Sequence, residues 1–245
     1  MRIKSPNAFL AGIKRCLIFT YLSVSCSAHP VLADGSVVSK IYHPYVQPLE
    51  KEIEFRSIYE KDDDLRDRQQ YKLAYGQSFS DTWFGEFYLI GSKDGGDAFE
   101  IEAYEAELKW QMTEQGEYAA DWGVLFELEK EEGGEWEALS ALLVEREWGR
   151  FVGTANLAAI YEWGDEVEDE LESKLALQMR YRHSPRFEPA IEFFAGEGYK
   201  GIGPLIMGRE ALGPAKRLRW ELGAIFAINN DSPDLTIKTS LEYEF

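Results

Sequence analysis

The last stretch of the chain, Leu235-Thr-Ile-Lys-Thr-Ser-Leu-Glu-Tyr-Glu-Phe245, alternates apolar with mostly polar residues. One face carries Leu235, Ile237, Thr239, Leu241, Tyr243 and Phe245, and the other carries Thr236, Lys238, Ser240, Glu242 and Glu244. Successive side chains of a β-strand point to opposite faces. The period of two therefore predicts a strand that separates an apolar environment from a polar one.

The same alternation recurs upstream. It sets Leu175 and Leu177 against Gln178 and Arg180, for example. These runs exceed the usual strand length of about 5–6 residues and suit a tilted membrane strand of about 9–11 residues. We count twelve such segments, near 49–59, 68–76, 82–91, 98–111, 118–129, 136–146, 150–163, 172–182, 186–195, 202–208, 216–228 and 234–245.

Three of the twelve segments are weaker. Residues 82–91 are apolar on both faces, residues 202–208 are short and contain Pro204, and the pattern of 98–111 slips as a bulge near Ala103 would cause. Ten strands is therefore the alternative count. Because an open sheet edge is not tolerated in lipid, the prediction is an all-β, closed, up-and-down antiparallel transmembrane β-barrel.

The connections between the segments alternate in charge. Counted from the first, the odd connections carry a large excess of acidic residues, and the even connections are nearly balanced. Successive connections of a membrane barrel emerge on opposite sides, so we name its two ends the odd end and the even end. All seven tryptophans sit at segment ends, as an interfacial girdle requires: Trp83, Trp110, Trp122, Trp148 and Trp220 beside even connections, and Trp136 and Trp163 beside odd ones.

The beginning of the chain predicts export. In residues 1–33 a basic stretch precedes an apolar run and then small residues, with cleavage expected after Ala28 or after Ala33. Residues 34–47 are interpreted as a periplasmic lead-in to a barrel of residues 48–245, with folding into the lumen as the alternative. Both cysteines, Cys16 and Cys26, lie in the expected signal, so we expect neither disulfides nor a cysteine metal site in the mature chain.

Composition excludes several classes of protein. The 245 residues include 44 Asp and Glu against 26 Lys and Arg, a formal net charge of −18. Such a charge excludes nucleic-acid binding through phosphate neutralisation. An aromatic content of 14% and a hydrophobic content of 45% are too high for a disordered acidic chain.

The C-terminal pattern Leu241-Glu-Tyr243-Glu-Phe245 resembles the terminal signature of Gram-negative outer-membrane β-barrels, in which a final aromatic residue follows alternating apolar positions. The resemblance implies an outer-membrane location and an assembly signal at Leu241, Tyr243 and Phe245 that the barrel-assembly machinery reads. It also implies contact with outer-membrane lipids and lipopolysaccharide.

Alternation also assigns an inward, lumen-lining face of mixed charge: Arg180, Arg182, Glu188, Glu192, Arg217, Arg219 and Glu221. Buried charges must be paired or hydrated. Either Arg180, Arg219, Glu192 and Glu221 form a network that fills the lumen, or water fills it and these side chains tune a pore. The first favours a plugged scaffold, and the second a narrow passive channel or porin-like protein for small polar solutes or ions.

An enzyme is the least favoured class. Outer-membrane lipid hydrolases use Ser and His, and the pair His183-Ser184 raises that possibility. Adjacent residues of an extended segment point apart, which disfavours a Ser–His hydrogen bond. Since His43 is the only other histidine after the expected signal, a histidine metal site is not expected. We therefore expect no enzymatic activity, no cofactor and no metal.

Overall fold

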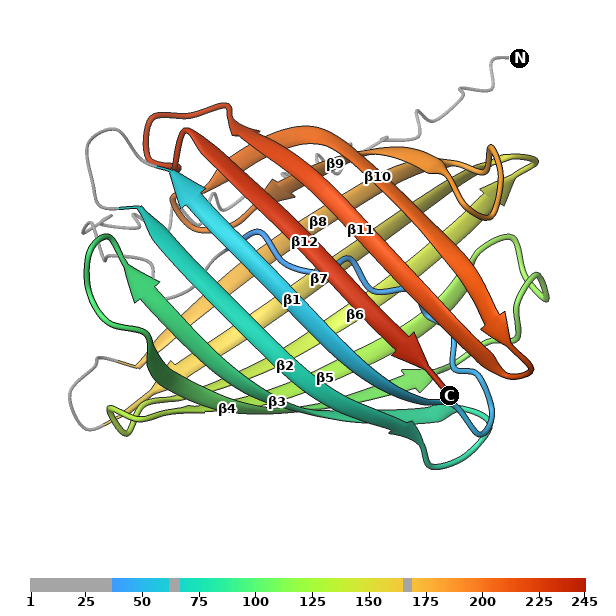
Figure 1. Cartoon of the computed structure of the whole chain (residues 1–245), viewed down its shortest axis with the longest axis horizontal. Coiled ribbons are helices and arrows are strands. Elements are labelled where there is room, and N and C mark those ends of the chain that lie inside the picture. The colour runs from blue at the N-terminus through green and yellow to red at the C-terminus, as the bar shows by residue number, and fades with distance from the viewer. Residues whose placement is uncertain (1–36, 62–66, 165–168) are drawn as a thin grey trace, which may run out of the picture. The chain divides into compact units, whose positions relative to one another are not determined.

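The computed structural model describes residues 37–61, 67–164 and 169–245. The expected signal, residues 1–33, lies outside the described residues. Twelve antiparallel strands follow one another around a closed barrel (Figure 1). They are β1 (Lys51–Lys61), β2 (Arg68–Ser78), β3 (Trp83–Asp94), β4 (Glu100–Gln111), β5 (Asp121–Glu131), β6 (Trp136–Trp148), β7 (Phe151–Trp163), β8 (Glu170–Tyr181), β9 (Glu188–Ala195), β10 (Lys200–Gly213), β11 (Lys216–Ala227) and β12 (Leu235–Glu244).

The barrel closes between β1 and β12. Their register runs from Glu52 opposite Glu244 to Lys61 opposite Leu235, and the Phe245 N–H donates to the Lys51 carbonyl at 2.8 Å. Closure satisfies the backbone groups that would otherwise form a sheet edge. The predicted all-β, up-and-down barrel of twelve strands is confirmed, and the alternative count of ten is wrong.

Two of the weaker segments show how local irregularities fit the barrel. Ile90 pairs with Ala103 and Gly91 with Ile101, so Glu102 is an extra residue in β4; this is the bulge predicted near Ala103. β10 runs to Gly213, well beyond its predicted end at residue 208. Pro204 interrupts pairing with β11 only locally, because the ladder resumes at Leu205 in the same register.

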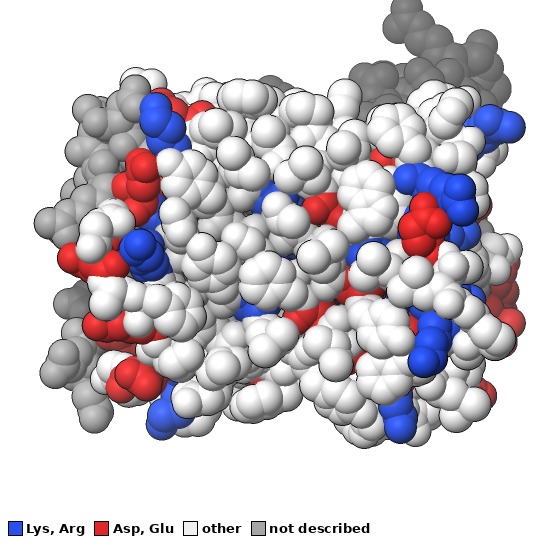
Figure 2. Space-filling model, viewed as in Figure 1, with Lys and Arg blue, Asp and Glu red and all other residues white. Residues whose placement is uncertain are grey.

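The two faces of the strands differ as the alternation predicts. In β12, Ile237 and Leu241 are exposed on the outside, whereas Lys238 and Glu242 are buried inside. Outward apolar side chains are also exposed on the other strands, among them Leu73, Phe87, Leu157 and Ile191. Figure 2 shows the result on one face: a largely uncharged band, with charged side chains gathered at both ends.

The predicted tryptophan girdle has paired members at both ends of the barrel. Trp83 and Trp110 stack at the even end with ring centroids 5.4 Å apart. Trp136 and Trp163 stack at the odd end at 6.2 Å. Indole rings suit the interface because one part of the ring is apolar and the N–H is polar. Within the described ranges, no helix has both the length and the apolar character needed to cross a bilayer.

Candidate functional site: a charged lumen crossed by residues 37–50

Residues 37–50, which we call the lumen segment, run through the interior of the barrel and lead into β1 (Figure 1). They begin near the odd end, where Val38 and Ile41 pack in an apolar cluster with Ala176, Phe194 and Ile225. The described part of the expected periplasmic lead-in therefore lies inside the barrel. It does so because its apolar side chains find buried partners there and its backbone finds polar ones.

The middle of the lumen segment is held by one side chain of β7. The Asn156 amide accepts the Tyr42 N–H at 2.7 Å and donates to the Tyr42 carbonyl at 2.9 Å. The Tyr42 hydroxyl donates to Glu107. This pairing replaces the backbone bonds that an extended segment lacks when no strand lies beside it.

The remaining contacts continue to the even end. His43 pairs with Glu145, and the Tyr45 hydroxyl donates to Asp121 at 2.7 Å. Further along, the Val46 N–H donates to Gln111 at 2.7 Å. These partners lie on three neighbouring strands, Glu145 on β6, Asp121 on β5 and Gln111 on β4, so this stretch of the segment is fixed against one side of the wall.

Gly123 of β5 gives the lumen segment the space it needs. A Cβ atom at Gly123 would lie 3.0 Å from Pro44 Cα and 3.1 Å from the Trp110 carbonyl oxygen. We expect Gly123→Leu to push the segment off this wall, because a whole side chain must fit where one methyl group is already tight. Tryptic cleavage after Lys40 in the folded protein measures the displacement. Ala190→Leu is the control, because Ala190 is equally buried but belongs to an apolar cluster that contains no residue of the lumen segment. Equal protection of the wild-type protein and both variants would contradict the prediction.

Lys40 joins the lumen segment to the β1–β12 wall. Its ammonium group lies 2.9 Å from Glu54 and 3.3 Å from Glu242. Glu54 also accepts from Arg56 at 2.8 Å. Glu54, Glu242 and Arg56 are all buried, and the pairing of opposite charges offsets much of the cost of removing them from water.

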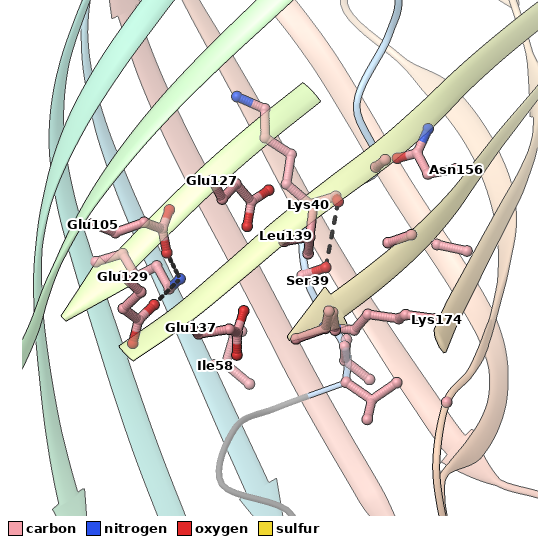
Figure 3. Close-up of a pocket in the computed structure, with 18 of the residues that line it drawn as sticks. Ser39, Lys40, Ile58, Glu105, Glu127, Glu129, Glu137, Leu139, Asn156 and Lys174 are labelled. Carbon is pink, nitrogen blue, oxygen red and sulfur yellow. Dashed lines mark hydrogen bonds and ion pairs between the residues drawn. The ribbon is translucent and has the colours of Figure 1, made fainter. Parts of the chain in front are cut away.

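A cavity of about 140 Å³ lies beside the lumen segment, and its lining reaches from Lys40 to the strands across the lumen. Figure 3 shows Glu105, Glu127, Glu129 and Glu137 grouped beside it, with Lys174 across from them. Lys72 lies 2.6 Å from Glu105 and 3.8 Å from Glu129. Over the whole lining, eleven Glu stand against six Lys or Arg. The cavity is therefore a polar space with an excess of negative charge.

The residues expected to line the lumen have these positions. Glu192 is fully buried and lies 3.0 Å from Lys238, and Arg180 lies 3.2 Å from Glu188. Arg219 pairs with Glu242 at 3.4 Å and also with Glu244. Glu221 lines the cavity. Nearer the even end are two partly exposed pairs, Arg182 with Glu147 at 2.5 Å and Arg217 with Glu244 at 3.3 Å.

The proposed network of Arg180, Arg219, Glu192 and Glu221 is not formed. Among the described residues no ion pair joins two of these four side chains, because each arginine and Glu192 has a nearer partner of opposite charge. Two further partners, Glu145 of Arg180 and Glu50 of Arg219, were not among the expected site residues. The alternation that predicts an inward side chain for Glu192 also predicts inward side chains for Glu52, Glu54 and Arg56 of β1. These three lumen residues could therefore have been found from the sequence.

A closed barrel with an apolar outer band, aromatic girdles and a charged interior is a transmembrane β-barrel. The structure resembles the COG4313 outer membrane channel from Pseudomonas putida F1, with a TM-score of 0.57 and 13% identity over 84% of this chain and 98% of that chain. It also resembles the KdgM porin in complex with disordered oligogalacturonate (0.53, 11%, 79% and 99%). A third similar structure is the β domain of the Bordetella autotransporter Brka (0.51, 11%, 80% and 99%).

These likenesses are at low sequence identity and show a shared fold. No protein-family model matches the sequence, and no curated protein matches it.

Proposed function

We propose that the protein is an outer-membrane β-barrel that acts as a narrow, passive channel with a preference for small cations. The observation that carries the proposal is the lining of the lumen cavity, where eleven Glu face six Lys or Arg. Charge that exceeds its partners must be hydrated or compensated by mobile ions. A hydrated acidic lumen attracts cations and repels anions. The fold shared with two outer-membrane channels supports the same function.

Ion selectivity tests this function. In planar bilayers with a salt gradient, we expect discrete openings and a reversal potential that indicates cation preference. The double variant Glu127→Gln and Glu137→Gln should reduce that preference, because both carboxylates line the cavity. Glu188→Gln is the matched control, since Glu188 faces Arg180 and does not line the cavity. A silent wild-type protein would refute the channel, and an anion preference would refute the proposed preference for cations.

A plugged scaffold without transport is the second candidate. Val38, Ile41 and Tyr42 of the lumen segment favour this candidate, because their buried side chains occupy part of the barrel interior and narrow the path for solutes. In that case no conductance is expected from the wild-type protein, and openings appear only when the segment is displaced. The same bilayer measurement therefore separates the two candidates.

The orientation and partners are also proposals. β1 begins at Lys51 at the even end, and Phe245, which follows β12, donates to the Lys51 carbonyl there. We therefore place the even end in the periplasm and the acidic odd end outside, facing lipopolysaccharide. Leu241 of β12 and Phe245, which directly follows that strand, are exposed, as recognition by the barrel-assembly machinery requires. The export signal would deliver the chain to that machinery.

We propose no catalytic role for His183 and Ser184. The His183 ring lies against the rings of Tyr181 and Phe187. Ser184 exchanges both backbone hydrogen bonds with Phe187 in the turn between β8 and β9. In the described part of the chain, no hydrogen bond between the Ser184 hydroxyl and the His183 ring supports an activated nucleophile.

A further inference from the structure

Three carboxylates meet inside the barrel on the wall formed by β1 to β3. Glu52 and Glu54 belong to β1 and Glu86 to β3, and each offers an oxygen within 4.8 Å of the others. Their exposed fractions are 4%, 0% and 7%. We call them the Glu52–Glu54–Glu86 cluster. Like charges at this spacing in a buried place repel one another strongly unless something compensates them.

Gly76 of β2 allows the cluster to form. Gly76 pairs with Glu52 on one side and with Glu86 on the other. A Cβ atom at Gly76 would lie 2.6 Å from Glu86 Cγ and 2.6 Å from Phe84 Cζ. The missing side chain therefore lets Glu86 lie across β2 toward Glu52, although β2 separates their strands.

Glu86 has no partner to neutralise it. Its Oε1 atom is buried without a hydrogen-bond partner, and none of the ion pairs among the described residues includes its carboxylate. The contrast with Glu54 is sharp, because Glu54 accepts from Lys40, Arg56, Tyr88 and Ser240. A buried carboxylate in this state is very costly, so Glu86 points to a missing positive partner.

The net charge of the surrounding side chains indicates the charge of that partner. A second group of close carboxylates, Glu50, Glu52 and Glu242, shares Glu52 with the cluster. With Glu244 the acids number six, and the bases that pair with them are four: Lys40, Arg56, Arg217 and Arg219. Because Arg56 also lies 4.0 Å from Glu107, at least two of the six carboxylates are left without a base of their own, and one divalent cation would neutralise two.

We propose that the Glu52–Glu54–Glu86 cluster binds one Ca²⁺ ion in the lumen. Calcium takes about 6–8 oxygen ligands in flexible geometry, and water in the lumen completes the set that Glu52 and Glu86 begin. Glu54 also pairs with Lys40 and Arg56, so it is only partly available to the ion. Calcium tolerates such a ligand because its coordination geometry is flexible. Binding would tie β1 to β3 beside the closure of the barrel, and it does not depend on whether the lumen conducts.

Calcium titration tests the site. The chain is produced without the expected signal, residues 1–33, then folded in detergent and freed of metal with EDTA. Calorimetry should give one Ca²⁺ per chain, and added Ca²⁺ should raise the thermal unfolding temperature. Glu86→Gln should weaken binding by roughly tenfold or more, since it removes a ligand charge. Gly76→Ala should weaken it comparably without changing any charge, because its Cβ displaces Glu86.

The control distinguishes this site from another acidic group. Glu170, Glu172 and Glu197 form a more exposed cluster at the odd end, so Glu172→Gln should leave calcium binding unchanged. Heat-dependent mobility on gels reports folding of every variant, and Glu52→Gln replaces Glu86→Gln if that variant does not fold. The proposal is overturned if the wild-type chain binds no Ca²⁺, if Glu86→Gln or its substitute binds normally, or if only Glu172→Gln loses binding.

Discussion

Leu177→Arg is expected to lower the free energy of unfolding from a bilayer by about 2–4 kcal/mol, the cost of an arginine on the lipid face near the midplane. Leu177 points outward from β8 with 37% of its surface exposed. On the same pair of strands, the aromatic pair Phe151–Tyr181 lies toward the even end, and Tyr161–Trp163 lies toward the odd end. Leu177 falls between these two interfacial groups, so a charge there has no headgroup within easy reach.

Leu171→Arg is the matched control. Leu171 lies on the same strand and the same face, is 73% exposed, and pairs with Tyr161 at the odd end. The same substitution at an interface costs only about 0–1 kcal/mol. Reversible urea unfolding in lipid vesicles measures both values. Equal costs at the two positions would show that the outer surface of β8 does not face a membrane of the expected thickness.

Asn156→Leu is expected to release the lumen segment and raise the mean conductance of the barrel. The substitution keeps the branching at Cγ and the number of side-chain heavy atoms, and it removes both hydrogen bonds to the Tyr42 backbone. Each polar group left without a partner costs about 1–3 kcal/mol when buried, and about 1.4 kcal/mol shifts an equilibrium tenfold. The segment should therefore leave its place at least about ten times more often.

Single-channel recording and tryptic cleavage after Lys40 provide two independent measurements of this release. Gln178→Leu is the control, because Gln178 is equally buried in the lumen wall but donates to Glu192 and not to the segment. We expect it to leave both measurements near the wild-type values. If Asn156→Leu conducts and resists trypsin as the wild-type protein does, the Asn156 contact does not hold the segment in place.

The lumen segment and the acidic cavity together determine what the proposed channel can pass. The segment occupies one side of the interior and is anchored along its length, so the space left for solutes lies along the acidic wall. A calcium ion in the Glu52–Glu54–Glu86 cluster would reduce the negative charge near the even end and leave that of the cavity unchanged. Cation preference and calcium binding are therefore separable by their own variants.

Much of the fold could be predicted because the residues of a membrane strand alternate in polarity along its own stretch of sequence. Each strand alternates between lipid and lumen, so the face of a residue such as Leu177 or Gln178 follows from its neighbours alone. Even the bulge in β4 was visible, since the extra residue Glu102 shifts the alternation by one. The length of β10 was not, because Pro204 disturbs the pattern more than it disturbs the pairing.

The candidate site could be predicted only in part. Alternation indicates that Glu192 points inward, but its partner Lys238 is on β12, three strands away from β9 around the barrel. Likewise, no spacing in the sequence relates Glu86 to Glu52, since their approach depends on Gly76 lying in register between them. Contacts of this kind depend on the register and closure of the whole sheet.

By itself, the sequence determined the all-β alternation, with twelve strands favoured and ten left open, the lipid-facing and lumen-facing residues, and the unequal charge of the two ends, because each depends on the order of residues within one strand or connection. Only the tertiary structure decided that residues 37–50 enter the lumen, which charges pair, and that three carboxylates converge on one point. The physical reason is that these contacts join residues far apart in the chain, and closing the barrel is what brings them within reach of one another.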